Sequence, residues 1–235
     1  MSVQDRNDTY RADQRSHFDE LTEEDWDDND FAVCGRLWNF EVARLFSVVR
    51  PKSILNLGCG CGFQDKQMAG YSFVESIRGL DYSPKSVEMA NARYAHPIVQ
   101  REVADFSEFK SGTLYDLVVS FQVIEHLEEP ESLIRLSRDC CKPGGHVAVF
   151  TPNRLRPYNR KRLAAGKEIE FEDPMHSVEF TLDELEALGV KNGLRVRRSF
   201  CYGSFDLGLP LWFSLWLSLY VPGLGDRMLV VFDKI

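Results

Sequence analysis

A glycine-rich segment near the first quarter of the chain has the composition of a ligand-binding loop. It contains Gly58, Gly60 and Gly62 directly after the short apolar run 53–57, and glycine allows the backbone to approach a ligand closely. Asp81 ends a second apolar run about 20 residues further on, a spacing at which a carboxylate can bind both hydroxyls of a ribose. A nucleoside site is therefore one interpretation. A plain tight turn, with Asp81 capping the next helix, is the other.

The residue at position 63 separates two classes of nucleotide-binding loop. Loops that bind the pyrophosphate of a nicotinamide or flavin dinucleotide carry a third glycine, in the pattern GxGxxG, where the helix packs closely on the strand. Counted from Gly58 and Gly60, that position is Phe63. The bulky ring argues against a dinucleotide and favours a smaller, adenosine-containing ligand.

Three side chains could accept a proton at neutral pH. Glu125 and His126 follow the apolar run 117–121, and His176 lies in the segment 174–180. Imidazole titrates near neutral pH, as a general base must. Structural roles are the alternative, because a carboxylate is favoured at the start of a helix and His176 could hold a loop in place.

The elements that would position these groups alternate between strands and helices. Apolar runs predict strands at 53–57, 76–80, 98–103, 117–121, 146–151, 194–201 and 228–232. Helical periodicity and capping residues predict helices at 31–49, 63–69, 84–94 and 129–141, the last closed by residues 142–145, and a further helix that opens at the capping box Thr181–Glu184. This alternation predicts an α/β fold whose mostly parallel sheet is covered by helices on both faces. Because no linker or repeat interrupts the pattern, residues 31–235 are predicted to form one domain.

Six short motifs occur in an order that resembles the class I S-adenosylmethionine-dependent methyltransferases. Between residues 54 and 153 they are Leu55-Asn56-Leu57-Gly58-Cys59-Gly60-Cys61-Gly62, Gly79-Leu80-Asp81-Tyr82-Ser83, Ala104-Asp105-Phe106, Tyr115-Asp116-Leu117-Val118-Val119-Ser120, Val123-Ile124-Glu125-His126-Leu127 and Lys142-Pro143-Gly144-Gly145. The resemblance implies a Rossmann-like, doubly wound, mostly parallel seven-stranded sheet with helices on both faces. It also implies S-adenosyl-L-methionine as the cofactor and methyl transfer as the reaction.

The resemblance assigns roles to individual residues around the cofactor. Gly58, Gly60 and Gly62 would line its methionine part. The other implied contacts are Asp81 on the ribose, Tyr82 beside the adenine, Asp105 accepting from the adenine amino group, the Phe106 backbone at the ring edge and Gln122 beside the sulfonium. Asn56 departs from the family, which usually has Asp or Glu there, so the cationic end of the cofactor would lose a nearby charge.

On the acceptor side, two motifs are similar to those of the branch that methylates small molecules, including quinone precursors. They are Glu125-His126 and the later pair of His176 and Phe180. We therefore expect Glu125, His126 and His176 to be the candidate catalytic residues, and a small, apolar or amphiphilic acceptor to be methylated at oxygen. A protein or tRNA target and a non-catalytic, cofactor-binding scaffold are the alternatives.

Two segments outside the motifs, near 151–180 and 205–226, are expected to contact the acceptor. Residues 151–167 hold six basic residues and no acid, which suits either an anionic group or a solvated loop. Residues 207–225 carry no charge, but they are interrupted by prolines and cannot form a helix that spans the roughly 30 Å hydrocarbon core of a bilayer. They could form buried core, a hydrophobic substrate wall or membrane-surface patch, or a dimer interface.

The net charge of −8 is concentrated at the beginning of the chain. Residues 1–30 hold eleven acids and three bases, whereas residues 31–235 hold 25 of each. The neutral body disfavours nucleic-acid binding through a general basic surface, and residues 1–30 are predicted to be an acidic leader or lid. The six cysteines form no CxxC pair, so we expect reduced thiols and no metal site. The polar start does not resemble a signal peptide. We therefore expect a cytoplasmic protein, with peripheral membrane contact through residues 207–225 as an open question.

Overall fold

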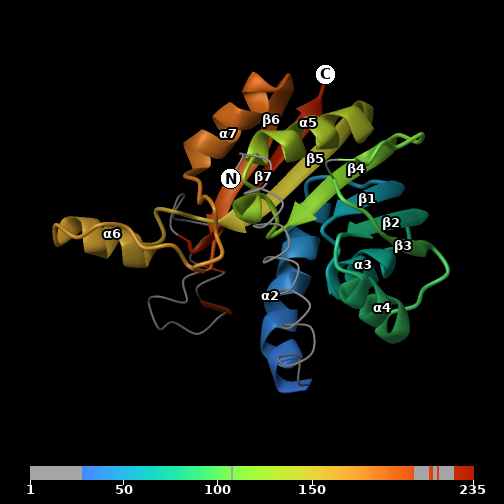
Figure 1. The fold of residues 1–235 in the computed structure, drawn as a ribbon, viewed down its shortest axis with the longest axis horizontal. Helices are drawn as coiled ribbons and strands as arrows, with labels where there is room; N and C mark the ends of the chain where they lie inside the picture. The colour runs from blue at the N-terminus through green and yellow to red at the C-terminus, as the bar shows by residue number, and fades with distance from the viewer. Residues whose placement is uncertain (1–27, 107, 204–211, 214–215, 217–224) are drawn as a thin grey trace, which may run out of the picture. The chain divides into compact units, whose positions relative to one another are not determined.

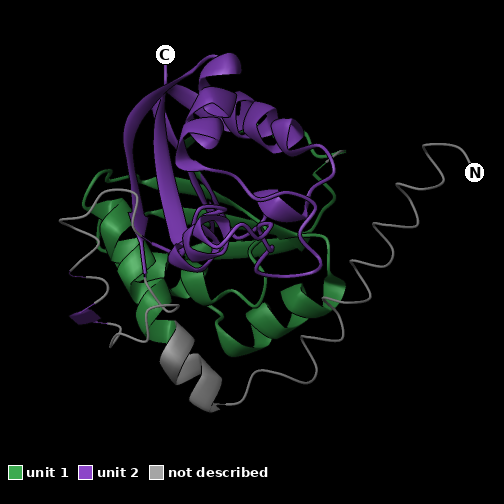
Figure 2. Cartoon of the chain, turned by 90° about the vertical axis from the view of Figure 1, so that its left-hand side faces the viewer, with its two compact units in different colours: residues 1–118 green, residues 119–235 purple. Residues whose placement is uncertain are grey.

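The computed structural model describes residues 28–106, 108–203, 212–213, 216 and 225–235. The chain divides into two compact units, residues 1–118 and 119–235, which Figure 2 shows in different colours. The boundary falls within strand β4 (Tyr115–Phe121).

The first unit alternates helices with parallel strands. Its elements before β4 are α2 (Asp28–Phe46), β1 (Ser53–Leu57), α3 (Phe63–Ala69), β2 (Ser76–Asp81), α4 (Pro84–Arg93) and β3 (Val99–Val103). β1 pairs in parallel with β2, and β2 pairs in parallel with β3, so that Leu57 aligns with Leu80 and Asp81 aligns with Val103. The carboxyl ends of the three strands therefore lie at one edge, which is where α/β sheets bind ligands (Figure 1).

Local sequence explains where the elements of this unit begin and end. The Ser83 hydroxyl accepts a hydrogen bond from the Ser86 amide, and Pro84 occupies the first turn, so α4 begins where the sequence predicts. The bounds of β1 and α3 are those predicted. α2 ends at Phe46, ahead of Pro51, which cannot continue a helix.

The second unit carries the antiparallel part of the sheet. Its elements after β4 are the 3₁₀ turn η1 (Ile124–His126), α5 (Pro130–Cys140), β5 (Cys141–Pro152), α6 (Pro157–Ala164), α7 (Leu182–Lys191), β6 (Leu194–Tyr202) and β7 (Arg227–Lys234). β7 pairs antiparallel with both β5 and β6. α7 begins at the predicted capping box, in which Thr181 and Glu184 exchange hydrogen bonds. Gly189 lets α7 lie close to β7, since a Cβ there would come within 2.2 Å of the Phe232 ring.

The order of the seven strands is β3-β2-β1-β4-β5-β7-β6. The chain fills the sheet in one direction from β1 to β3 and in the opposite direction from β4 onward, which is the doubly wound arrangement. The predicted fold class, a Rossmann-like, mostly parallel seven-stranded sheet with helices, is confirmed.

Three elements differ from the prediction. β5 begins at Cys141, so residues 142–145 start a strand instead of closing the preceding helix. The reason is local, because Pro143 restricts the residue before it to extended backbone. The basic segment 151–167 contains the helix α6, which was not predicted. α2 begins at Asp28, inside the predicted leader. Residues 1–27 and most of 205–226 lie outside the described residues, so the lid and the roles of 205–226 stay predictions.

Candidate functional site

The glycine loop adopts the backbone conformation that its glycines allow. Gly58, Gly60 and Gly62 have φ angles of 79°, 48° and 79°, in the left-handed region that other residues enter at a cost. The amides of Gly58 and Cys59 donate to the Leu80 carbonyl at 2.8 and 2.9 Å, which ties the loop to the end of β2. A Cβ at Gly60 would meet none of the described residues within 4 Å, so the described part of the chain leaves open space beside this glycine.

Asp81 fixes the loop through both of its carboxylate oxygens. Oδ2 accepts from the Gly60 amide at 2.8 Å, and Oδ1 accepts from the Ser83 amide at 3.0 Å. The first bond orients the loop and the second supports the turn into α4. Asp81 therefore does more than cap a helix, and its contact with a ribose stays a prediction.

Asn56 lies on β1, two residues before Gly58, and is buried. Its Nδ2 donates to Asp65 Oδ1 at 2.8 Å, and its Oδ1 has no hydrogen-bond partner among the described residues. A second carboxylate at position 56 would face the buried carboxylate of Asp65 and repel it. The amide at this position thus has a local physical reason, whereas its predicted contact with the cofactor remains a prediction.

Asp65 forms a fully buried ion pair with Arg101, which was not predicted from the sequence. Arg101 Nε donates to Asp65 Oδ2 at 2.8 Å. The same guanidinium reaches the carbonyls of Gly62, Ala90 and Tyr94 at 3.2–3.4 Å. One side chain on β3 therefore connects the glycine loop, α3 and α4.

The residues predicted to surround the adenine lie at the ends of β2 and β3. The Ala104 amide donates to the Asp81 carbonyl at 2.8 Å, which holds the segment containing Asp105 and Phe106 beside the end of β2. Asp105 is exposed, and Tyr82 and Phe106 are half-buried. The loop conformation, the open space at Gly60 and this placement of carboxylates fit an adenosine-containing cofactor.

Gln122, at the end of β4 in the second unit, has a strained backbone. Its φ is 54°, and it is the only non-glycine residue with positive φ among the described residues. Its amide donates to the Phe150 carbonyl at 3.0 Å, and its Nε2 is buried with no partner in the described part of the chain. Strain and an unsatisfied donor are typical of ligand-binding positions, but the predicted contact with a sulfonium is untested.

Glu125 is completely buried on η1. Its Oε2 accepts from the Thr151 hydroxyl at 2.9 Å, whereas its Oε1 has no partner among the described residues. Burial is the main cause that raises the pKa of Glu125 to about 7, against the opposing hydrogen bonds and the charge of His176.

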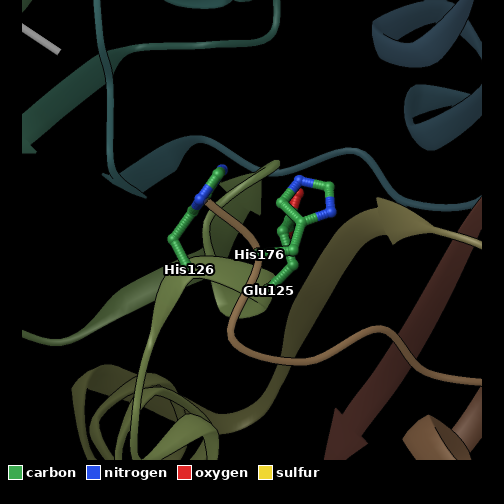
Figure 3. Close-up of side chains that lie close together, drawn as sticks. All are labelled: Glu125, His126 and His176. Carbon is green, nitrogen blue, oxygen red and sulfur yellow. The ribbon is translucent and has the colours of Figure 1, made fainter. Parts of the chain in front are cut away.

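His126 and His176 lie together, although 50 residues separate them. Their ring centroids are 4.8 Å apart, and Figure 3 shows both rings and Glu125 projecting to the same side. The amides of Ser177 and Val178 donate to the Glu125 carbonyl at 2.8 and 3.1 Å, which fixes the His176 segment on η1.

Glu179 orients His176 and was missed from the sequence. Its Oε1 lies 2.9 Å from His176 Nδ1, and its Oε2 accepts from Arg156 at 3.0 Å. Burial lowers the pKa of His176, but the hydrogen bond to Glu179 and the negative charges around the ring outweigh it and leave the pKa above its ordinary value. The only signal in the sequence is the spacing of three residues between His176 and Glu179.

Three of the six basic residues in the segment 151–167 form ion pairs within the protein. Arg156 is buried against Glu179, Arg154 pairs with Glu184, and Arg162 pairs with Glu170 at 2.9 Å. These ion pairs join residues 151–167 to Glu170, Glu179 and Glu184, a role that differs from the anion site and the solvated loop expected from the sequence.

The described part of the uncharged segment exposes two aromatic side chains. Trp212 and Trp216 are 72% and 50% exposed. No helix within the described ranges combines the length and the apolar character that crossing a bilayer requires.

Comparisons with known proteins agree with this geometry. A family model described as a methyltransferase domain matches residues 33–199. The ubiquinone biosynthesis O-methyltransferase of Cupriavidus pinatubonensis is 30% identical over 115 residues, which are 46% of this chain and 44% of that protein. The enzyme of the same name from Vibrio parahaemolyticus is 32% identical over 108 residues, 44% of this chain and 45% of the relative. The chain therefore matches less than half the length of these curated relatives.

Solved structures show the same fold at low sequence identity. A chain of the complex between the Haloferax volcanii Trm112 methyltransferase activator and a methyltransferase superposes with a TM-score of 0.68 at 18% identity, covering 94% of this chain and 96% of that chain. The N-methyltransferase NodS of Bradyrhizobium japonicum, bound to S-adenosyl-L-homocysteine, gives a TM-score of 0.63 at 17% identity and covers 94% and 97%. The family model spans well over half of the chain and agrees with the order of the six motifs. The chain therefore belongs to the class I S-adenosylmethionine-dependent methyltransferases.

Proposed function

We propose that this protein transfers a methyl group from S-adenosyl-L-methionine to an oxygen atom of a small, apolar or amphiphilic acceptor. Family membership supports the reaction, and the names of the relatives, ubiquinone biosynthesis O-methyltransferases, favour oxygen as the methylated atom. The observation that carries the proposal is the bond from the Gly60 amide to Asp81, which holds the loop in its left-handed conformation.

The cofactor would be held by groups on the glycine loop and at the ends of β2 and β3. Gly58, Gly60 and Gly62 would face its methionine part, Asp81 the ribose hydroxyls and Asp105 the adenine. When bound, S-adenosyl-L-methionine supplies an electrophilic methyl carbon: the acceptor oxygen forms the new C–O bond, the electron pair of the broken C–S bond stays on sulfur, and the hydroxyl proton leaves. Precise positioning provides most of the acceleration in such a transfer.

The proton would leave toward the cluster of Glu125, His126 and His176. A carboxyl whose pKa is about 7 and an imidazole oriented by Glu179 are groups that can exchange protons at neutral pH. We expect His126→Ala and His176→Ala each to lower turnover of an identified acceptor by at least tenfold, with cofactor affinity unchanged.

Calorimetry with S-adenosyl-L-homocysteine tests the cofactor site. Asp81→Asn removes the negative charge and one of two acceptors, so we expect at least tenfold weaker binding, as for a hydrogen bond to a charged group. Glu88→Ala, an exposed acid on the neighbouring α4, is the matched control and should bind like the wild type. Equal affinity for the Asp81→Asn variant, with circular dichroism showing a folded protein, would refute the assignment.

Turnover is tested with methyl-labelled cofactor and a panel of small hydroxylated aromatic and lipid-like acceptors. Transfer of label to oxygen is the expected result. Cofactor binding without transfer to any member of the panel would instead favour a scaffold, and label found only in added protein or tRNA would contradict a small-molecule acceptor.

A further inference from the structure

The cluster of Glu125, His126 and His176 has the composition of a metal centre. We propose that these three side chains bind one divalent first-row transition-metal cation, of the Mn²⁺ to Zn²⁺ series. Two imidazoles and one carboxylate are ligands that such cations accept, and they leave further coordination positions open. The prediction of no metal site, which rested on the cysteines, is replaced by this inference.

The distances are close to those of a bound site. One ligand atom of each residue lies within 4.8 Å of the others. Ligands at about 2.1 Å from a metal are separated by about 3.0–3.4 Å in octahedral or tetrahedral geometry, so the side chains need to close by little more than an ångström. His126 and His176 each have one ring nitrogen held by a neighbouring acceptor, so the second nitrogen of each ring is the one that would approach the cation.

The tautomer of each histidine follows from its neighbour. His126 Nδ1 lies 3.3 Å from the Met175 carbonyl, and His176 Nδ1 lies 2.9 Å from the Glu179 carboxylate. Both partners are acceptors, so each Nδ1 must carry the hydrogen, and the lone pair of each neutral ring resides on Nε2. A carboxylate or carbonyl that accepts from the second ring nitrogen is the usual support for a histidine ligand.

Glu125 supplies an independent indication of a ligand. Its side chain is fully buried, and its Oε1 has no hydrogen-bond partner among the described residues. An unsatisfied carboxylate oxygen in the interior is costly, and a cation between Oε1 and the two imidazoles would satisfy it. The hydrogen bond from Thr151 to Oε2 leaves Oε1 as the oxygen that would bind the metal.

The cation would have a catalytic role in the proposed methyl transfer, and this role rests on the proposed function. An acceptor hydroxyl bound at an open coordination position would lose its proton more easily, because a cation lowers the pKa of a bound oxygen. The histidines would then act as ligands, and their loss would impair turnover through the loss of the metal.

Titration of tag-free protein with Mn²⁺, followed by electron paramagnetic resonance, tests the site directly after dialysis against a chelator. We expect one Mn²⁺ per chain, at least tenfold weaker binding in His126→Ala and His176→Ala, and a smaller loss in Glu179→Gln, which replaces the carboxylate that contacts His176 Nδ1 and Arg156 with a neutral amide. His96→Ala, an exposed histidine on the loop before β3, is the control and should bind like the wild type.

A second cation identifies the ligands. Co²⁺ should give the weak visible bands of nitrogen and oxygen ligation. An intense near-ultraviolet thiolate band would assign the metal to cysteines and overturn the proposal. Absence of stoichiometric Mn²⁺ and Co²⁺ binding, or binding unaffected by both histidine variants, would do the same.

Binding of S-adenosyl-L-homocysteine separates this inference from the proposed function. If chelated protein binds S-adenosyl-L-homocysteine but no cation, the metal site is wrong and the cofactor assignment stands. If the cation binds and S-adenosyl-L-homocysteine does not, the metal site stands and the proposed function is wrong.

Discussion

The glycine loop and the Glu125–His126–His176 cluster obtain their shapes from different parts of the chain. The loop depends mainly on its backbone: Gly58, Gly60 and Gly62 have left-handed φ angles, and the amides of the loop donate to the Leu80 carbonyl and to the Asp81 carboxylate at the end of β2. The cluster is a side-chain structure, in which η1 and a segment about fifty residues later meet through His126, His176 and Glu179. The first should therefore be sensitive to backbone strain, and the second to the loss of single buried contacts.

The variant with the largest expected effect tests whether the loop also depends on a buried side chain. Arg101→Met leaves the buried carboxylate of Asp65 without its ion pair, so we expect the free energy of unfolding to fall by about 3–5 kcal/mol in urea denaturation. Lys52→Ala, which removes an exposed ion pair with Glu75, is the control and should leave it nearly unchanged. If both variants have the same free energy of unfolding, the loop needs no buried side chain. The loop and the Glu125–His126–His176 cluster would then differ even more than we propose.

Backbone strain is tested by two glycines of the same loop. Gly62→Ala places a Cβ at 2.8 Å from Ala90 Cβ and 2.9 Å from Arg101 Nε, so it should cost more than the about 1–2 kcal/mol of left-handed strain alone. In Gly60→Ala the Cβ meets no atom of the described residues within 4 Å, so the variant should cost only that strain, yet weaken S-adenosyl-L-homocysteine binding if the cofactor passes there. Urea denaturation and calorimetry on both variants measure the two quantities.

Two outcomes would contradict the expected difference between the two glycine variants. Equal unfolding free energies for Gly60→Ala and Gly62→Ala would mean that contacts with Ala90 and Arg101 do not limit the loop. Wild-type affinity for S-adenosyl-L-homocysteine in Gly60→Ala would mean that the open space beside Gly60 is not part of the cofactor site.

The difference between the backbone-built loop and the side-chain cluster also explains which features could be predicted from the sequence. The bounds of β1 and α3 and the start of α4 depend on signals within a few residues, such as Ser83 before Pro84, and they agree with the structure. The position of Asp81 against the loop could also be predicted, because a parallel strand after one helix ends beside its neighbour.

Long-range side-chain pairs could not be predicted. Arg101 meets Asp65 across 36 residues, and Arg156 meets Glu179 across 23 residues. Nothing in the local pattern says which acid neutralises which base, so from the sequence Arg156 is only one of six basic residues in a segment that suits an anionic group or a solvated loop. The sequence predicts Glu125, His126 and His176 as candidates from their chemistry, their positions and the family resemblance, but nothing in it predicts that the three side chains meet.

A third cluster of side chains, around Asp233, gives a smaller and pH-dependent effect. Burial raises the pKa of Asp233, but the hydrogen bond from Arg195 and the charges of Arg197 and His146 outweigh it and leave the pKa below its ordinary value. The folded protein therefore favours the carboxylate, which stabilises it above the unfolded aspartate pKa of about 3.9. This contribution is lost as the pH falls through the lowered folded pKa.

Asp233→Asn should consequently lower the free energy of unfolding at pH 7 by about 1–2 kcal/mol, the size of a charge-assisted hydrogen bond. The difference from the wild type should persist down to about pH 4 and then decrease. A difference that grows on acidification would show that the sign is wrong, and urea denaturation at several pH values decides between the two.

The smallest expected effect on stability belongs to the exposed tryptophans of residues 207–225. Trp212 and Trp216 lie largely in solvent, so replacing both with Ala should change the free energy of unfolding by no more than about 0.5 kcal/mol. If they form a membrane-surface patch, the same variant should lose sedimentation with vesicles of phosphatidylcholine and phosphatidylglycerol. Val190→Ala, an exposed apolar residue on α7, should retain it. Vesicle binding that is absent in the wild type, or equal in all three proteins, would contradict a membrane-surface patch. If the stability is also unchanged, a hydrophobic substrate wall or a contact between subunits would be the remaining explanations for the two exposed rings.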